Sequence, residues 1–296
     1  MILYLDNEND QNRDPFKQKI NDVLLKTYSK VHMIEFNKDA LSCYSVSEHI
    51  KQNDELIVIW NSLKPFCTWA VDLCQRFNKD YVLVERGLVP SQGVDNFCFF
   101  AGGLCFDNLN IDPKYFDPNT YENNKEIINS HYKEKNLQRI EPKDKIVFIG
   151  QVTFDSTVTH FHSVTDQIQI IDNYISDNQI DTDKTKIVYC PHPRMRKEFK
   201  ECKYPVSNQE TINECLDAKL VVAISSTTIY EIAGLGIPID ILGKGKYPFP
   251  TQRNWNNITE CLSTALDFHF NTNTDSSKIK SIIDQTVRIV KEKGER

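Results

Sequence analysis

The 296-residue sequence lacks long apolar runs. No run approaches the ~18 apolar residues that a helix needs to span a bilayer. The N-terminal stretch MILYLDNEND has no basic region that leads into an apolar segment, as a secretory signal has. The sequence therefore predicts a cytoplasmic protein, and it leaves open a peripheral association with the cytoplasmic face of the inner membrane.

The sequence also lacks an excess of positive charge and lacks closely paired cysteines. The formal net charge is −6, and because a duplex-binding protein usually carries a basic face, we expect no nucleic-acid partner. A nucleotide-sugar stays compatible with this charge, since helix dipoles and a few cations can bind one phosphate. The nine cysteines include no CxxC pair, which argues against zinc and favours buried, reduced thiols.

The chain does contain a regular alternation of short apolar runs and amphipathic segments. The runs are continuous, as in parallel strands that are covered on both faces, and the alternation predicts a doubly wound α/β fold. The predicted strands are residues 2–5, 31–36, 56–60, 81–84, 146–149, 187–189, 220–224 and 238–242. The predicted helices are residues 14–28, 64–77, 121–136, 164–177, 208–218, 227–235 and 276–293.

The length suggests two domains, at roughly 100–200 residues for each. The segment RIEPKDK at residues 139–145 has the composition of a linker and precedes a new strand. We therefore predict one domain over residues 1–140, a second over residues 141–275, and a final amphipathic helix within residues 276–296.

Polar residues gather at the C-terminal ends of four predicted strands, the edge at which open α/β sheets bind ligands. Two of these clusters contain a carboxylate. Glu85 ends one strand together with Arg86, and it is either a general acid or base or a member of an ordinary strand-end ion pair. Asp155 follows another strand, and it is either the second carboxylate of a glycosyl-transfer pair or a helix N-cap.

The other two clusters suit a phosphate. His192 stands between Pro191 and Pro193, whose rings fix the backbone, so its imidazole can donate to a phosphate oxygen; the alternative is a structural histidine. Four hydroxyl residues at 225–228 precede a predicted helix, whose first N–H groups are further donors; the alternative is a simple Ser/Thr N-cap. Glu231, one turn into that helix, can accept hydrogen bonds from ribose hydroxyls.

No metal site is predicted. His160 and His162 lack a third ligand at helical spacing, so we place them on a loop surface. The Asp-x-Asp triplet that begins at Asp181 precedes a predicted strand, and it should lie at the sheet edge away from the ligand.

Five motifs follow one another over about residues 55–245. They are Trp60-Asn61-Ser62, Glu85-Arg86-Gly87-Leu88-Val89-Pro90, Gly150-Gln151-Val152-Thr153-Phe154-Asp155-Ser156, Pro191-His192-Pro193, and Ser225-Ser226-Thr227 through Gly236-Ile237-Pro238. Taken in this order, they resemble the motifs of the bacterial capsule polysaccharide biosynthesis family of Kdo transferases. Cys190 stands where that family commonly has a lysine, and Ser62 where it has glycine.

The resemblance implies a GT-B fold, in which two Rossmann-like domains with parallel sheets face a central cleft. The second domain would hold the CMP-sugar, the first would hold the acceptor, and the helix at 276–296 would cross back toward the first domain. The implied reaction transfers Kdo from CMP-Kdo to a saccharide or lipid-linked glycan in capsule or lipopolysaccharide O-antigen synthesis. It would need no cofactor or metal and would retain the anomeric configuration.

The resemblance also implies roles for residues. Asp155 would be the nucleophile, Glu85 the general acid/base, and His192 the group that stabilises the leaving phosphate or the sugar carboxylate. Two alternatives remain: a transferase for another CMP-linked ulosonate, such as a sialic-acid relative, and a nucleotide-sugar-binding protein without catalysis. The other implied substrate-binding residues are Asn61, Arg86, Gly87, Gln151, Ser156, Pro193, Arg194, Ser225, Ser226, Thr227 and Glu231.

Overall fold

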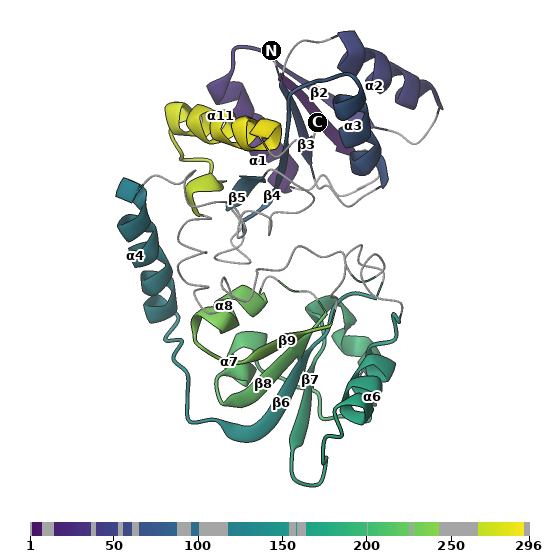
Figure 1. Ribbon diagram of the computed structural model, residues 1–296, viewed down its shortest axis with the longest axis vertical. Coiled ribbons are helices and arrows are strands. Elements are labelled where there is room, and N and C mark those ends of the chain that lie inside the picture. Colours follow the sequence, from purple (N-terminus) through teal and green to yellow (C-terminus); the bar gives the residue numbers. More distant parts are fainter. Residues whose placement is uncertain are drawn as a thin grey trace. The chain divides into compact units, whose positions relative to one another are not determined.

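The computed structural model divides into two compact units (Figure 1). The first comprises Met1–Asn124 and Cys261–Arg296, and the second comprises Lys125–Glu260. The boundary thus falls after residue 124, where the sequence analysis put it after residue 140, and residues 261–275 group with the first unit. The structure describes residues 2–7, 15–36, 40–52, 56–60, 65–87, 96–100, 118–153, 158, 164–199, 201–224, 226, 228–242 and 266–292.

The first unit contains a six-stranded sheet in the order β10-β5-β4-β3-β1-β2. The four strands β2, β1, β3 and β4 are parallel, while β5 runs antiparallel to β4 and β10 antiparallel to β5. The four strands predicted for this unit are therefore parallel, as expected, and the sheet is mixed because it also contains β5 and β10, which the sequence analysis did not predict. The Gly87 N–H donates to the Asn96 carbonyl at 2.8 Å, next to the antiparallel pair of β4 and β5. The strands are β1 Ile2–Asn7, β2 Val31–Phe36, β3 Leu56–Trp60, β4 Tyr81–Arg86, β5 Phe97–Phe100 and β10 His269–Phe270.

Helices cover both faces of this sheet (Figure 1). Helix α1 (Pro15–Thr27) packs beside α11 (Ser276–Glu292), and α2 (Ala40–Gln52) packs beside α3 (Pro65–Arg76). The C-terminal helix α11 lies on this unit: Ser276 Oγ donates to the Lys26 carbonyl at 3.2 Å, and Lys291 Nζ lies 2.5 Å from Asp80 Oδ2. Its buried residues are Ile279, Ile282, Ile283, Thr286, Ile289 and Val290.

The second unit contains a four-stranded sheet in the order β7-β6-β8-β9, and all of its strands are parallel. Helix α6 (Gln167–Asp177) covers one face, and α7 (Thr211–Cys215) with α8 (Thr228–Gly234) covers the other (Figure 1). Helix α4 (Pro118–Glu134) begins before the boundary between the units. The strands are β6 Lys143–Ile149, β7 Lys186–Cys190, β8 Ala218–Ala223 and β9 Ile239–Ile241.

Both units place their first strand between the second and the third, with the fourth beyond the third. This is the doubly wound pattern, and it confirms the predicted α/β class with two Rossmann-like domains. None of the helices formed by the described residues is long and apolar enough to cross a membrane. The seven cysteines that the structure describes are all free and five are buried, as predicted.

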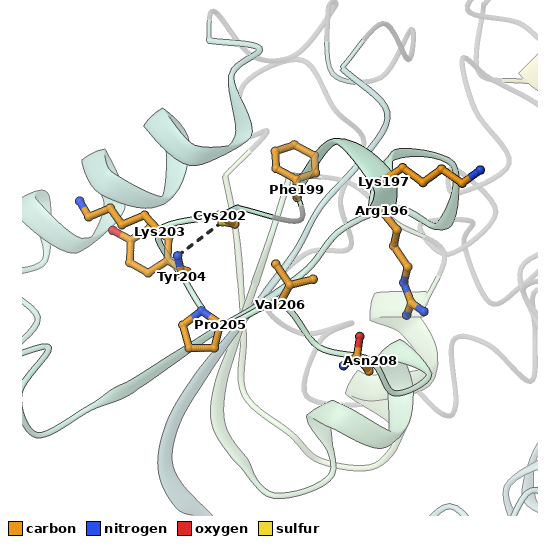
Figure 2. A pocket seen from close by; sticks show the side chains of 9 residues that line it. All are labelled: Arg196, Lys197, Phe199, Cys202, Lys203, Tyr204, Pro205, Val206 and Asn208. Carbon is orange, nitrogen blue, oxygen red and sulfur yellow. Dashed lines mark hydrogen bonds between the residues drawn. The ribbon is translucent and has the colours of Figure 1, made fainter.

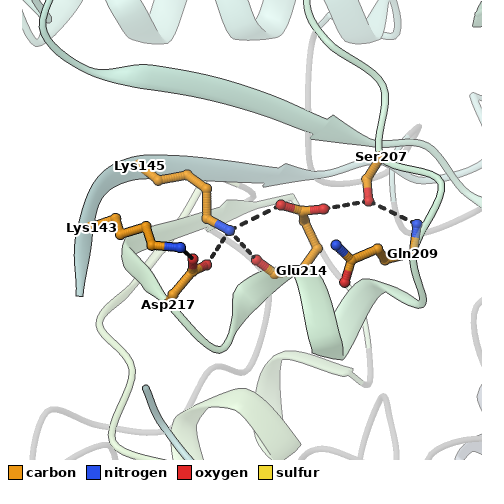
Figure 3. Close-up of polar contacts among 6 residues, drawn as sticks. All are labelled: Lys143, Lys145, Ser207, Gln209, Glu214 and Asp217. Carbon is orange, nitrogen blue, oxygen red and sulfur yellow. Dashed lines mark hydrogen bonds and ion pairs between the residues drawn. The ribbon is translucent and has the colours of Figure 1, made fainter. Parts of the chain in front are cut away.

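A buried ion cluster lies where β6 begins, at the end of the second sheet opposite the expected ligand edge (Figure 3). Lys145 is 6% exposed, and its Nζ lies 2.9 Å from Glu214 Oε1 and also pairs with Asp217. Lys143 Nζ lies 2.7 Å from Asp217 Oδ2, and Ser207 Oγ donates to Glu214 Oε2 at 2.6 Å. Burial alone would lower the pKa of Lys145, but its hydrogen bonds to Asp217 and Glu214 outweigh that effect and raise it.

Candidate functional site

Three of the motif segments leave the second sheet at the same level. The register pairs Ile149 at the end of β6 with Cys190 of β7 on one side and with Ala223 of β8 on the other. The segments that begin at residues 150, 191 and 224 therefore start side by side at the carboxyl edge. Since the strand order reverses between β6 and β8, two of them flank the point at which such sheets bind ligands.

His192 is held in one orientation at this edge. Its Nδ1 accepts a hydrogen bond from the Arg194 N–H at 3.2 Å, and its carbonyl accepts one from the Met195 N–H at 2.8 Å. An Nδ1 that accepts leaves the proton of the neutral ring on Nε2, which makes Nε2 the donor. The half-buried imidazole thus suits an anionic oxygen, whereas Pro193 and Arg194 are exposed at the start of the 3₁₀ helix η3 (Pro193–Phe199).

Cys190, which precedes this motif, is 2% exposed. Burial raises the pKa of its thiol to about 12, with a further contribution from the charge of Glu214. The thiol is therefore neutral at physiological pH and cannot supply the positive charge of the lysine that the related motif commonly has there.

Gly150 and Gln151 are positioned by close packing. A Cβ atom on Gly150 would lie 2.5 Å from the Tyr189 hydroxyl, so the backbone passes over the ring only because residue 150 has no side chain. The Tyr189 ring packs edge-on against Phe199, with 5.1 Å between the ring centroids. The Gln151 N–H donates to Gln167 Oε1 at 3.2 Å, which fixes the first residue after the glycine.

Ser226 lies just before helix α8. Its Oγ accepts from the N–H of Thr228, the first residue of the helix, at 3.3 Å. Ser225 and Thr227 lie outside the described residues.

Glu231 is held by a residue that the sequence analysis did not identify. Its carboxylate is 4% exposed, and Oε1 lies 2.7 Å from Nε2 of His131 on α4. The Tyr132 hydroxyl donates to the Glu231 carbonyl at 3.0 Å, and this contact with α8 places α4 from residue 125 onward in the second unit. No local pattern could have shown the pair, because 100 residues separate its members.

Glu85 lies in β4, one residue beyond the point where β3 ends, and is half-buried. It is opposite Cys98 of β5, and the exposed Arg86 is opposite Phe97. A Cβ atom on Gly87 would lie 2.5 Å from the side chains of both Asn96 and His269, and the buried His269 comes from β10 near the C-terminus. The C-terminal segment therefore helps to shape the end of this predicted motif.

Several of the remaining predicted positions cannot be placed among the described residues. Asn61, Asp155 and Ser156 lie outside the described residues, as do His160 and His162. The turn at Asp181–Asp183 precedes β7, at the opposite end from Gly150. Among the residues that the structure describes, no group of three or more His, Cys, Asp or Glu side chains is placed to hold a metal ion.

No protein-family model and no curated protein matches the chain. Among solved structures, KpsC from Thermosulfurimonas dismutans, a beta Kdo 2,7 transferase, is similar over 97% of this chain and 99% of that one, with a TM-score of 0.59 and 16% identity. The likeness shows the fold: the chain has the GT-B type of two Rossmann-like domains.

The spinosyn rhamnosyltransferase SpnG (TM-score 0.33, 8% identity, all of both chains) and the wall teichoic acid polymerase TagF (0.28, 11%, all of this chain and 90% of that one) are more distant. These two scores are too low to support a conclusion about this chain.

Proposed function

We propose that this protein is a glycosyltransferase that moves Kdo from CMP-Kdo to a saccharide or lipid-linked glycan acceptor in bacterial surface polysaccharide synthesis, at the cytoplasmic face of the inner membrane. The five ordered motifs support the donor class. The likeness to the KpsC chain supports the reaction class. Because CMP offers one phosphate, the reaction on this proposal needs no cofactor or metal.

The observation that carries the proposal is the geometry around His192. Its Nδ1 is occupied by the Arg194 N–H, so the ring presents a donor and not an acceptor to a ligand at the carboxyl edge. The segment that begins at Gly150 leaves the sheet at the same level, and the Gly150 N–H donates to the Cys190 carbonyl at 2.8 Å. A fixed N–H donor at this edge suits the charge that develops on a leaving phosphate.

In the proposed mechanism the Asp155 carboxylate attacks the anomeric carbon of Kdo. The bond from that carbon to the CMP phosphate oxygen breaks, CMP leaves, and the His192 Nε2–H stabilises its new charge. Glu85 then takes the proton of an acceptor hydroxyl, whose oxygen attacks the same carbon and frees Asp155. Two displacements at one carbon give net retention.

A donor panel tests the substrate class. We expect the protein to hydrolyse CMP-Kdo slowly without acceptor and to leave CMP-sialic acid largely intact, as measured by mass spectrometry with EDTA present. Faster turnover of CMP-sialic acid would favour the other ulosonate class. CMP binding without turnover of any CMP-sugar would favour a binding protein.

The variant His192→Ala tests the site. We expect a loss of about 10²-fold in turnover of CMP-Kdo, the size of effect seen when one oxyanion donor is removed. His49→Ala, which changes an exposed histidine of α2, is the matched control and should leave turnover unchanged. Wild-type turnover and CMP affinity in a folded His192→Ala protein would falsify the assignment.

A further inference from the structure

A hollow of about 690 Å³ lies beside η3 in the second unit (Figure 2). We call it the η3 hollow. None of the residues that line it belongs to the five motifs of the donor edge. They are Arg196, Lys197, Phe199, Cys202, Lys203, Tyr204, Pro205, Val206 and Asn208.

The η3 hollow lies along the outer edge of the sheet. Strand β7 is the last strand on that side, and Val206 forms a parallel bridge to Tyr189 on its outer edge. The Tyr189 N–H donates to the Pro205 carbonyl, and the Ser207 N–H donates to the Tyr189 carbonyl, each at 2.9 Å. The hollow is thus built on backbone that is fixed to the sheet, and η3 connects it to His192.

Its walls combine cations with apolar surface. Residues 194–203 contain five Lys or Arg and two Glu, a local charge of +3 in a chain whose net charge is −6. In the view of Figure 2, Arg196 and Lys203 lie on either side of Val206 and Pro205, with Phe199 above them. A ligand that matches these walls carries an anionic group on a partly apolar body.

Arg196 supplies the most specific feature. Its Nη2 donates to the Gln209 carbonyl at 2.8 Å, which orients the guanidinium. A planar guanidinium held in this way is well matched to carboxylate and phosphate.

Lys203 and Tyr204 form the opposite wall. Lys203 Nζ lies 3.0 Å from Asp172 Oδ1 and 5.3 Å from the centre of the Tyr204 ring, and the Tyr204 hydroxyl donates to the same carboxylate oxygen. These hydrogen bonds, that of Tyr204 first, lower the pKa of Asp172, so its carboxylate stays ionised. Because Asp172 partly offsets the charge of Lys203, Arg196 is the main site for an anion, and Tyr204 is a fixed ring beside it.

We propose that the η3 hollow binds an acidic saccharide outside the reacting centre, with its carboxylate or phosphate on Arg196 and a sugar ring against Tyr204. An amphipathic ring and the amide of Asn208 suit a sugar, which has both apolar and hydroxyl faces. The choice of a saccharide rests on the proposed function, while the choice of an anion rests on the hollow itself.

Calorimetric titration of the whole chain tests this inference with three probes: trigalacturonate for a carboxylate, glucose 6-phosphate for a phosphate, and neutral maltotriose. We expect at least one acidic probe to bind about tenfold or more tightly than maltotriose, with affinity that falls as salt rises. The acidic probe that binds identifies the anion. Equal affinity for acidic and neutral probes, or no binding of either acidic probe, would overturn the proposal.

Arg196→Gln should weaken the acidic probe about tenfold, and Arg196→Lys should recover part of that loss, because it keeps the charge without the planar fork. Lys184→Gln is the matched control, since that side chain is 81% exposed on the same unit. Unchanged affinity in Arg196→Gln would overturn the site. CMP titration of the wild type and of each variant separates the two hypotheses. If the wild-type protein fails to bind CMP, that result contradicts the proposed function but not the binding of an acidic saccharide in the η3 hollow.

Discussion

The two sheets share one strand order and differ in how each is completed. The second is built from a contiguous stretch and is parallel throughout, so three of its loops leave at one level. The first adds two antiparallel strands, and one of them, β10, comes from the far end of the chain. The comparison shows that the same fold can form a carboxyl edge within one contiguous stretch in one unit and depend on a distant segment in the other.

The first unit's dependence on the C-terminal segment gives the largest expected effect. Phe270 of β10 is 3% exposed, and its ring stacks on Phe99 with 4.4 Å between the centroids. Phe270→Ala should destabilise the first unit by about 3–5 kcal/mol, while Phe270→Leu should cost much less. Hydrogen exchange followed peptide by peptide should show faster exchange in β4 and β5 and little change in β6 to β8. Equally faster hydrogen exchange in both units would contradict the prediction that Phe270 stabilises the first unit alone.

The second unit depends instead on its buried ion cluster. Lys145→Met leaves the Glu214 and Asp217 carboxylates without their main partner, and we expect a cost of about 3 kcal/mol. Lys143→Met is the matched control, because that lysine contacts the same Asp217 but is 73% exposed, so its loss should cost about 0–1 kcal/mol. Urea unfolding, monitored by hydrogen exchange in β6 and β8, measures the loss of stability in both variants.

The same cluster predicts a dependence on pH. Burial alone would raise the pKa of Asp217, but the hydrogen bonds from Lys143 and Lys145 outweigh it and hold the pKa below its ordinary value. A carboxyl whose folded pKa is lowered stabilises the fold above its unfolded pKa, near ~3.9, and that contribution is lost as the pH falls through the folded pKa. Between pH 5 and pH 3, Asp217→Asn should therefore lose less stability than the wild type. Equal losses in the two proteins would show that the Asp217 carboxylate does not cause the pH dependence.

The sequence predicted the contiguous parts of the fold better than the distant ones. The bounds of β2 and β3 were predicted as observed. Strand β3 reads LIVIW, and such a continuous apolar, β-branched run marks a buried strand. Strand β10 has two residues, too few for any periodicity, and β5 has only four, FCFF, all apolar and without alternation. Helix α2 was missed because its segment ALSCYSVSEHIKQ mixes serines with apolar residues and has no clear stripe.

The candidate site follows the same rule. The motif around His192 was found because two prolines adjoin it in sequence, whereas the hydrogen bond that orients its ring depends on the course of η3. The contact of His131 with Glu231 and the contact of His269 with Gly87 join distant segments. Pairs of this kind leave no local pattern, because packing and not spacing brings them together.

His131 gives a smaller effect, at the carboxyl edge of the second sheet. If Glu231 binds the ribose hydroxyls, its orientation by His131 should matter for ribose and not for phosphate. We expect His131→Ala to weaken CMP about tenfold and to reduce the preference for CMP over 2′-deoxy-CMP, while His131→Gln, which keeps an N–H donor, retains part of it. Calorimetry with both nucleotides measures this preference. A full preference in a folded His131→Ala protein would show that His131 acts only in packing.

The smallest effect is expected for two tyrosines of the second unit that differ in one contact. The Tyr132 hydroxyl donates to the Glu231 carbonyl at 3.0 Å, so Tyr132→Phe should cost about 0.5–1.5 kcal/mol. The Tyr189 hydroxyl is buried beneath Gly150 and has no hydrogen-bond partner in the part of the chain that the structure describes. Tyr189→Phe should therefore be neutral or stabilise by up to about 1 kcal/mol, because it removes an unsatisfied group and keeps the ring against Phe199. Urea unfolding of the two variants under identical conditions decides between them. If Tyr189→Phe costs as much as Tyr132→Phe, the Tyr189 hydroxyl has a partner, and titration with CMP would show whether nucleotide binding depends on that contact.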